Sequence, residues 1–135
     1  MALAVSLVSI IEQDLFVKLL EFERAHGSCQ NVLIKDNNTV LHEAVKHNSL
    51  MIATYLCATY PLLCKKQNNL GQTPLHLYCL SDPQTPTLGQ TLIPCSDLSQ
   101  VDGKNQTAQD VANQCAPDFV RHLFNPVSPP TLSMP

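Results

Sequence analysis

The chain has 135 residues, of which 44% are hydrophobic and 14% charged, and its formal net charge at pH 7 is −3. This length suits one domain that buries roughly two thirds of its unfolded surface, and the apolar content excludes an intrinsically disordered protein. The basic residues form no patch beyond Lys65-Lys66. We therefore expect no direct contact with nucleic acid.

The N-terminal segment is apolar as far as Ile11 but lacks a basic region, and Glu12 and Asp14 follow before a span of about 20 residues is reached. We expect neither a secretory signal nor a membrane helix. The expected location is the cytoplasm, with the nucleus as a second location open to the protein.

Two helices are expected before residue 27. Apolar residues recur from Leu3 to Ile11 and again at Leu15, Phe16, Leu19 and Leu20. We interpret residues 1–34 as an N-terminal capping unit that ends in a loop through Gly27, Ser28 and Asn31.

A turn followed by a helix start then occurs three times, 34 residues apart. Each copy ends in a threonine whose hydroxyl suits a helix N-cap. These residues are Thr39, Thr73 and Thr107. Two residues earlier, each copy has a residue type that tolerates a positive φ. These residues are Asn37, Gly71 and Asn105. The last two copies also have a short polar side chain that can brace the turn, Asn68 and Asp102.

Helical patterns fill the intervals between these turns. Two apolar faces follow the first turn, at Leu41, Ala44 and Val45 and then at Leu50, Ile52, Ala53, Leu56 and Cys57. After the second turn, prolines and a glycine leave only residues 87–93 for a second helix of about two turns. The last two expected helices are Ala108–Gln114 and Asp118–Phe124, and residues 125–135 form a proline-rich tail that we expect to be disordered.

The run Thr73-Pro74-Leu75-His76 is the turn-and-helix signature of ankyrin repeats, which recur about every 33 residues. Weaker copies begin at Thr39 and Thr107. The chain thus resembles an ankyrin-repeat protein, which implies an all-α solenoid of about three to four helix-turn-helix units. The expected ankyrin-repeat domain spans 1–124, with the capping unit at 1–34 and repeats at 35–67, 68–101 and 102–124.

A closer resemblance rests on the run from Gln67 to Leu77 and on the unit that begins at Thr39. Both are similar to the first two repeats of the cytoplasmic inhibitors of Rel/NF-kappa-B transcription factors, which have short viral versions. The chain departs from the cellular pattern because it has no Asp-Ser-Gly phosphodegron, fewer repeats and no acidic tail. The resemblance implies a protein–protein interaction module that inhibits Rel/NF-kappa-B and escapes signal-dependent degradation. The alternative is a generic ankyrin adaptor, or a scaffold domain of a larger protein, with an unrelated partner.

Ankyrin proteins usually hold partners with the tips of the turns and the exposed side of the first helix in each pair. Carried over by register, the expected protein-binding residues are Lys35, Asp36, Asn38, Glu43, Lys46, His47, Asn69, Leu70 and Gln72. Leu70 is the expected apolar anchor, and Asp36 and Glu43 would attract a basic segment of the partner. The alternative for the polar residues is an ordinary solvated surface. Leu70, Leu77 and Leu80 either form an exposed patch or are covered by residues 82–95.

The six cysteines are irregularly spaced and include no Cys-x-x-Cys pair. We expect reduced thiols that serve as small buried hydrophobic groups, in particular at Cys57 and Cys79. Metal binding and redox use remain alternatives.

No phosphate-binding loop, nucleophile elbow or zinc-protease motif is found in the sequence. His42 and His76 lie in neighbouring units, about 10 Å apart by helix packing, which is too far to share a metal ion. The ankyrin resemblance implies instead that each imidazole braces the next turn. We expect no enzyme activity, no catalytic residue, no metal site and no cofactor.

Overall fold

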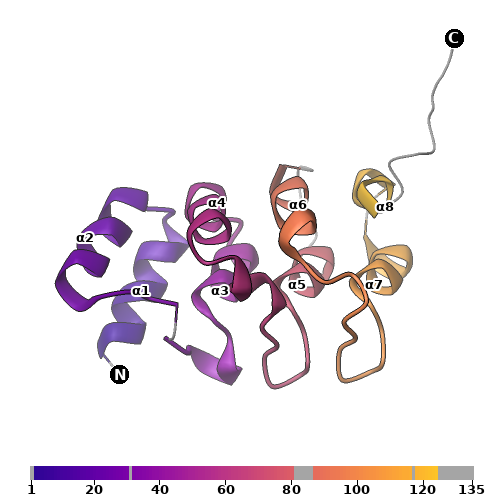
Figure 1. Ribbon diagram of the computed structural model, residues 1–135, viewed down its shortest axis with the longest axis horizontal. Coiled ribbons are helices and arrows are strands. Elements are labelled where there is room, and N and C mark those ends of the chain that lie inside the picture. Colours follow the sequence, from indigo (N-terminus) through magenta and orange to yellow (C-terminus); the bar gives the residue numbers. More distant parts are fainter. Residues whose placement is uncertain (1, 31, 81–86, 117, 125–135) are drawn as a thin grey trace, which may run out of the picture.

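The computed structural model describes residues 2–30, 32–80, 87–116 and 118–124 (Figure 1). Within these ranges the protein is all-α, as predicted. The described part contains no strand longer than a single bridge, between Leu33 and Thr39. None of the described helices is long and apolar enough to cross a membrane.

The α-helices are α1 (Ala2–Glu12), α2 (Phe16–His26), α3 (Val40–Lys46), α4 (Leu50–Thr59), α5 (Pro74–Leu80), α6 (Thr87–Leu92), α7 (Ala108–Cys115) and α8 (Asp118–Phe124). Short 3-10 segments are η1 (Lys35–Asn37), η2 (Pro61–Lys65) and η3 (Ile93–Cys95). Every helix expected from the sequence is found, and α6 has the short length predicted for it.

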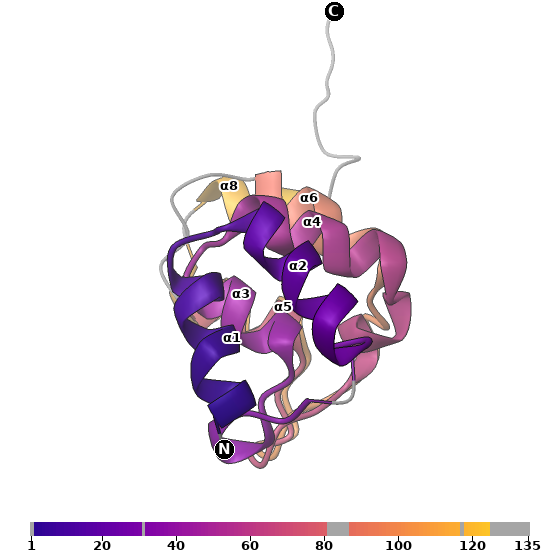
Figure 2. The same ribbon diagram turned by 90° about the vertical axis from the view of Figure 1, so that its left-hand side faces the viewer.

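The helices form two rows. Consecutive contacts join α1, α3, α5 and α7 in one row, and α2, α4, α6 and α8 in the other. Each helix of the first row also contacts the next helix along the chain, so the molecule is a series of helix pairs placed side by side (Figure 1). Figure 2 shows the same rows from the α1–α2 end. The turns before α3, α5 and α7 project beyond the first row (Figure 1).

The core lies between the two rows and continues from pair to pair. Leu41 and Leu75, at equivalent positions of α3 and α5, are 0% and 1% exposed. Ile52 and Leu56 contribute from α4, and Val120 from α8. Burying a leucine side chain stabilises a fold by about 1.5–3 kcal/mol, so these apolar stripes supply the main driving force for stacking.

Polar contacts attach the N-terminal helix pair to its neighbour. The Ser49 hydroxyl donates to the Ile11 carbonyl, and the Asp14 carboxylate accepts from the backbone N–H of Met51 at 3.3 Å and of Ile52 at 3.1 Å. Asp14 thereby satisfies two of the free N–H groups at the start of α4, where Ser49 makes no side-chain cap.

A second link joins the far ends of α2 and α4. The Glu23 carboxylate accepts from the Tyr55 hydroxyl, from the Tyr60 hydroxyl at 2.6 Å and from the Cys29 backbone N–H at 3.0 Å. Burial opposes ionisation of Glu23, but these hydrogen bonds outweigh it and lower the pKa of the carboxyl. The N-terminal pair is therefore an integral part of the stack.

The third helix pair is tightly packed at a glycine. A Cβ atom built on Gly89 of α6 would lie 2.6 Å from Leu123 Cδ1 and 2.7 Å from the Tyr78 ring. Only glycine permits α6 to approach α5 and α8 this closely. The predicted disordered tail, residues 125–135, and the proline-rich segment 81–86 lie outside the described residues.

Candidate protein-binding surface

Three turns with the same backbone hydrogen bond form one edge of the molecule. In each, the N–H of the first residue donates to the carbonyl of the fifth, at 2.8 to 3.0 Å. The pairs are Ile34–Asn38, Asn68–Gln72 and Asp102–Gln106. The predicted positive φ is present in all three turns, with 61° at Asn37, 76° at Gly71 and 62° at Asn105. Local residue chemistry therefore determines the turn geometry.

Side chains brace these turns as expected. Asn68 Oδ1 accepts from the backbone N–H of Leu70 and of Gln72, both at 3.0 Å. In the next turn, Asp102 Oδ1 accepts two equivalent bonds, at 2.9 and 3.0 Å. Thr39 and Thr107 cap their helices through the predicted hydroxyl contacts.

Neighbouring turns are also bonded to each other. The Asn69 N–H donates to the Asp36 carbonyl at 3.0 Å, and the Gly103 N–H donates to the Leu70 carbonyl at 2.8 Å. Gly71 lies within this contact, since a Cβ there would be 2.7 Å from the Gly103 nitrogen. The turn tips are therefore held in a fixed array, and a partner would not have to order them on binding.

Two buried histidines support the turns from below. His42 Nδ1 accepts from the Thr39 backbone N–H at 3.0 Å, so Nε2 carries the proton and donates to the Gln72 carbonyl at 2.8 Å. His76 repeats the arrangement with Thr73 at 3.1 Å and the Gln106 carbonyl at 2.8 Å. Burial lowers the pKa of His42, which keeps its imidazole neutral. The bracing expected of both histidines is present.

Two of the predicted binding residues are not surface groups. Asn38 is 7% exposed and Glu43 is 4% exposed. Asn38 Nδ2 donates to Glu43 Oε2 at 3.0 Å, and Asn38 Oδ1 accepts from Asn68 Nδ2 at 2.9 Å. Both side chains are therefore buried and satisfied, because Asn38 pairs with Glu43 of its own unit and with Asn68 of the next turn.

Glu43 has two basic neighbours, one on α3 and one at its end. His47 Nε2 lies 3.4 Å from Glu43 Oε1, and Lys46 Nζ lies 4.0 Å from Glu43 Oε2. His47 is half-buried and also lies 3.9 Å from Glu12, whereas Lys46 remains exposed. Because Glu43 is buried and has these basic neighbours, it is poorly placed to attract a basic segment of a partner. Asp36 is an exposed acidic residue at the tip of the first turn.

The other predicted residues remain accessible. Lys35, Asp36 and Asn69 are exposed, and Gln72 is half-buried. Leu70 has 65% of its surface exposed at a turn tip.

A groove of about 670 Å³ lies between the second and third turns. Leu70 and Asn69 line it together with Leu80, Lys104 and Gln114 from α5, the third turn and α7. Leu80 is 48% exposed, whereas Leu88 and Leu92 of α6 are buried in the core. Within the described part of the chain, the α6 segment therefore does not cover Leu70 and Leu80. Gln114 was not predicted to contribute, because its proximity to Leu70 arises only when α7 stacks beside α5.

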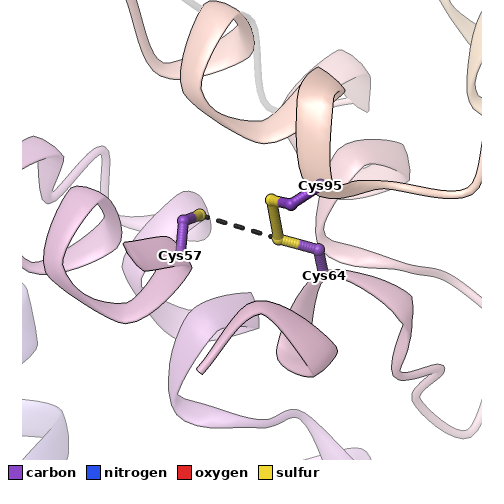
Figure 3. Close-up of side chains that lie close together, drawn as sticks. All are labelled: Cys57, Cys64 and Cys95. Atoms are coloured by element: carbon purple, nitrogen blue, oxygen red, sulfur yellow. Dashed lines mark hydrogen bonds between the residues drawn. A yellow bond between two sulfur atoms is a disulfide. The ribbon is translucent and has the colours of Figure 1, made fainter. Parts of the chain in front are cut away.

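The cysteines depart from the expectation of reduced thiols. Cys64 in η2 and Cys95 in η3 form a disulfide with a Cα–Cα distance of 6.0 Å (Figure 3). Cys29, Cys57 and Cys79 are buried and lie outside the disulfide, and burial was predicted for the last two. Burial raises the pKa of the Cys57 thiol to about 11 and that of Cys29 to about 12. The pairing could not be read from the spacing, because it joins the ends of two different helix pairs.

No protein-family model and no curated protein matches the chain. Among solved structures, the chain is similar to a chain from a complex between a predatory endopeptidase of Bdellovibrio bacteriovorus and an immunity protein, with a TM-score of 0.66 and 24% sequence identity. The similarity covers 88% of this chain and 62% of that chain, so this chain spans less than two thirds of its structural neighbour. In all, 218 chains of known structure match, and a fold this common does not identify a function.

Proposed function

We propose that the protein is an ankyrin-repeat binding module and that the row of turn tips, with the groove beside it, holds a protein partner. The observation that carries this proposal is the hydrogen-bonded array of turns that presents Leu70. An apolar side chain on a rigid, pre-ordered tip loses little conformational entropy when it is buried, and it gains the full benefit of leaving water. The structural neighbour comes from a complex of two proteins, which is compatible with such a role.

The favoured partner is a Rel/NF-kappa-B transcription factor, which the protein would bind as an inhibitor in the cytoplasm or nucleus. The support is the resemblance of the segment from Gln67 to Leu77 to the inhibitor repeats. Asp36 supplies an exposed carboxylate next to the second turn, suited to a basic segment of the partner. Such a contact raises the association rate more than the affinity and weakens with salt.

The alternative is a generic adaptor or scaffold domain with an unrelated protein partner. The lining of the groove favours this alternative, because most of its side chains are amides or apolar and few are charged. Few charged groups are therefore present to select one particular partner. We expect no enzyme activity in either case, since the buried His42 and His76 are engaged in structural contacts.

The test is capture of Rel subunits from a cell extract by the immobilised protein. We compare wild type with Leu70→Asp, and with Leu62→Asp as a matched control, since Leu62 is 67% exposed on η2, away from the turns. A central apolar anchor contributes about 2 kcal/mol or more, so Leu70→Asp should reduce affinity by roughly 30-fold while Leu62→Asp binds normally.

Absence of Rel subunits from the wild-type capture would refute the inhibitor proposal and leave the adaptor. Equal retention by all three proteins would keep the partner but show that the binding surface lies elsewhere.

A further inference from the structure

Three cysteines from three separate segments meet between the second and third helix pairs (Figure 3). Cys57 lies in α4, Cys64 in η2 and Cys95 in η3. Cys57 Sγ is 3.6 Å from Cys64 Sγ, and all three sulfur atoms lie within 4.8 Å of one another. The disulfide accounts for the proximity of Cys64 and Cys95, but not for the position of the Cys57 thiol beside them.

The 3.6 Å between the Cys57 and Cys64 sulfurs suits two ligands of one metal ion. A thiolate binds Zn²⁺ at about 2.3 Å, so two sulfurs of a tetrahedral site are about 3.8 Å apart. Opening the disulfide frees Cys64 and Cys95 to move apart toward that separation.

The composition of the cluster restricts the ion. Among the described residues, the group contains no histidine and no carboxylate. Thiolate-only sites favour thiophilic cations such as Zn²⁺ and Cu⁺ over Mg²⁺ and Ca²⁺, which prefer oxygen ligands. Cys57 and Cys64 are buried, whereas the half-buried Cys95 lines a hollow of about 390 Å³ with Leu62, Lys65 and Ser96. The hollow provides a path by which an ion or a reductant enters.

We propose that Cys57, Cys64 and Cys95 of the reduced protein bind one thiophilic d¹⁰ cation, Zn²⁺ or Cu⁺. The ion replaces the disulfide as the link between η2 and η3 and adds α4 to it. A thiol or phosphine reductant supplies the two electrons that cleave the Cys64–Cys95 bond, which leaves two thiols. Metal binding then releases the thiol protons to solvent. Three sulfurs suffice for Cu⁺, while Zn²⁺ takes a fourth ligand from solvent through the hollow.

The experiment uses the full chain, reduced and then freed of reductant without air. Titration with Cd²⁺ should produce a sulfur-to-metal charge-transfer band that saturates at one ion per chain. Cys57→Ala should weaken binding by at least about tenfold, because loss of a direct ligand costs no less than loss of an outer-shell partner. Cys29→Ala is the matched control, another buried free thiol outside the cluster, and should bind as wild type does. Displacement of Cd²⁺ by Zn²⁺ or by Cu⁺ identifies the preferred ion.

A second measurement needs no variant. Zn²⁺ should slow the alkylation of Cys57, Cys64 and Cys95 of the reduced wild-type protein, as mapped by mass spectrometry, and leave the alkylation rates of the buried Cys29 and Cys79 unchanged. Protection of other cysteines, absence of the charge-transfer band, or equal binding by Cys57→Ala would each overturn the proposal.

Discussion

Replacing His42 with phenylalanine removes the hydrogen bonds of a fully buried ring and keeps a ring of similar size. The Thr39 N–H then loses its partner, which is 3.0 Å away in the wild type, whereas the Gln72 carbonyl loses the imidazole at 2.8 Å but keeps its bond from the Asn68 N–H. An unsatisfied buried donor costs about 1–3 kcal/mol and a lost hydrogen bond about 1 kcal/mol, so we expect His42→Phe to lower the free energy of unfolding by about 2–4 kcal/mol. A small domain has only about 5–15 kcal/mol in total, so the loss should be easy to measure.

Urea unfolding at pH 7.5, followed by circular dichroism at 222 nm, measures this change. His122→Phe is the control, because His122 is an exposed histidine on α8, and it should change stability by less than about 0.5 kcal/mol. Equal midpoints for His42→Phe and wild type would refute the inference that the imidazole holds the turn.

The stabilities of the wild-type and His42→Phe proteins should also depend differently on pH. Burial places the folded-state pKa of His42 below its usual value of 6.5, so the unfolded chain binds the proton more readily. Stability from neutral His42 is fully present above about pH 6.5 and is lost as pH falls from there through the folded-state pKa. The difference in the free energy of unfolding between wild type and His42→Phe should therefore decrease in mildly acidic solution. A difference that stays constant with pH would contradict the inference that burial lowers the pKa of His42.

Three further changes test the packing. Leu75→Ala empties a core position and should cost about 2–5 kcal/mol in urea unfolding, and an unchanged midpoint would mean that the repeat register is wrong. Glu23→Gln should lower the free energy of unfolding by about 1–2 kcal/mol, because it weakens the hydrogen bonds from two tyrosines. Since the pKa of Glu23 is lowered in the folded protein, this extra stability of the wild type should be present above about pH 4.5 and disappear as pH falls through the folded-state pKa. Gly89→Ala should lower thermal stability by about 1 kcal/mol, because the new methyl meets Leu123 and Tyr78, whereas an exposed helix glycine changed to alanine is stabilising by about that amount.

Local structure could be predicted from the sequence because neighbouring residues determine it. The turns need a positive φ at Asn37 and Asn105, and asparagine tolerates it. The helices begin after Thr39 and Thr107, whose hydroxyls accept hydrogen bonds from the N–H groups three residues later. Both features recur with the repeat, so the turns and helix starts were located correctly. The short α6 followed in the same way from the surrounding prolines.

The surface and the sulfur cluster depend on how one helix pair stacks on the next, which sequence patterns do not report. Glu43 has the residue type of a solvated helix face, yet it is buried and bonded to Asn38, which Asn68 of the next turn holds in place. Cys64 and Cys95 are 31 residues apart and meet only because η2 and η3 end side by side. Sequence patterns report which face of a helix is apolar, whereas the identity of the atoms across an interface is determined by the packing distance and angle between units. Residue patterns along the chain thus predict the helices and turns, whereas the stacking of the units determines which polar groups and thiols meet.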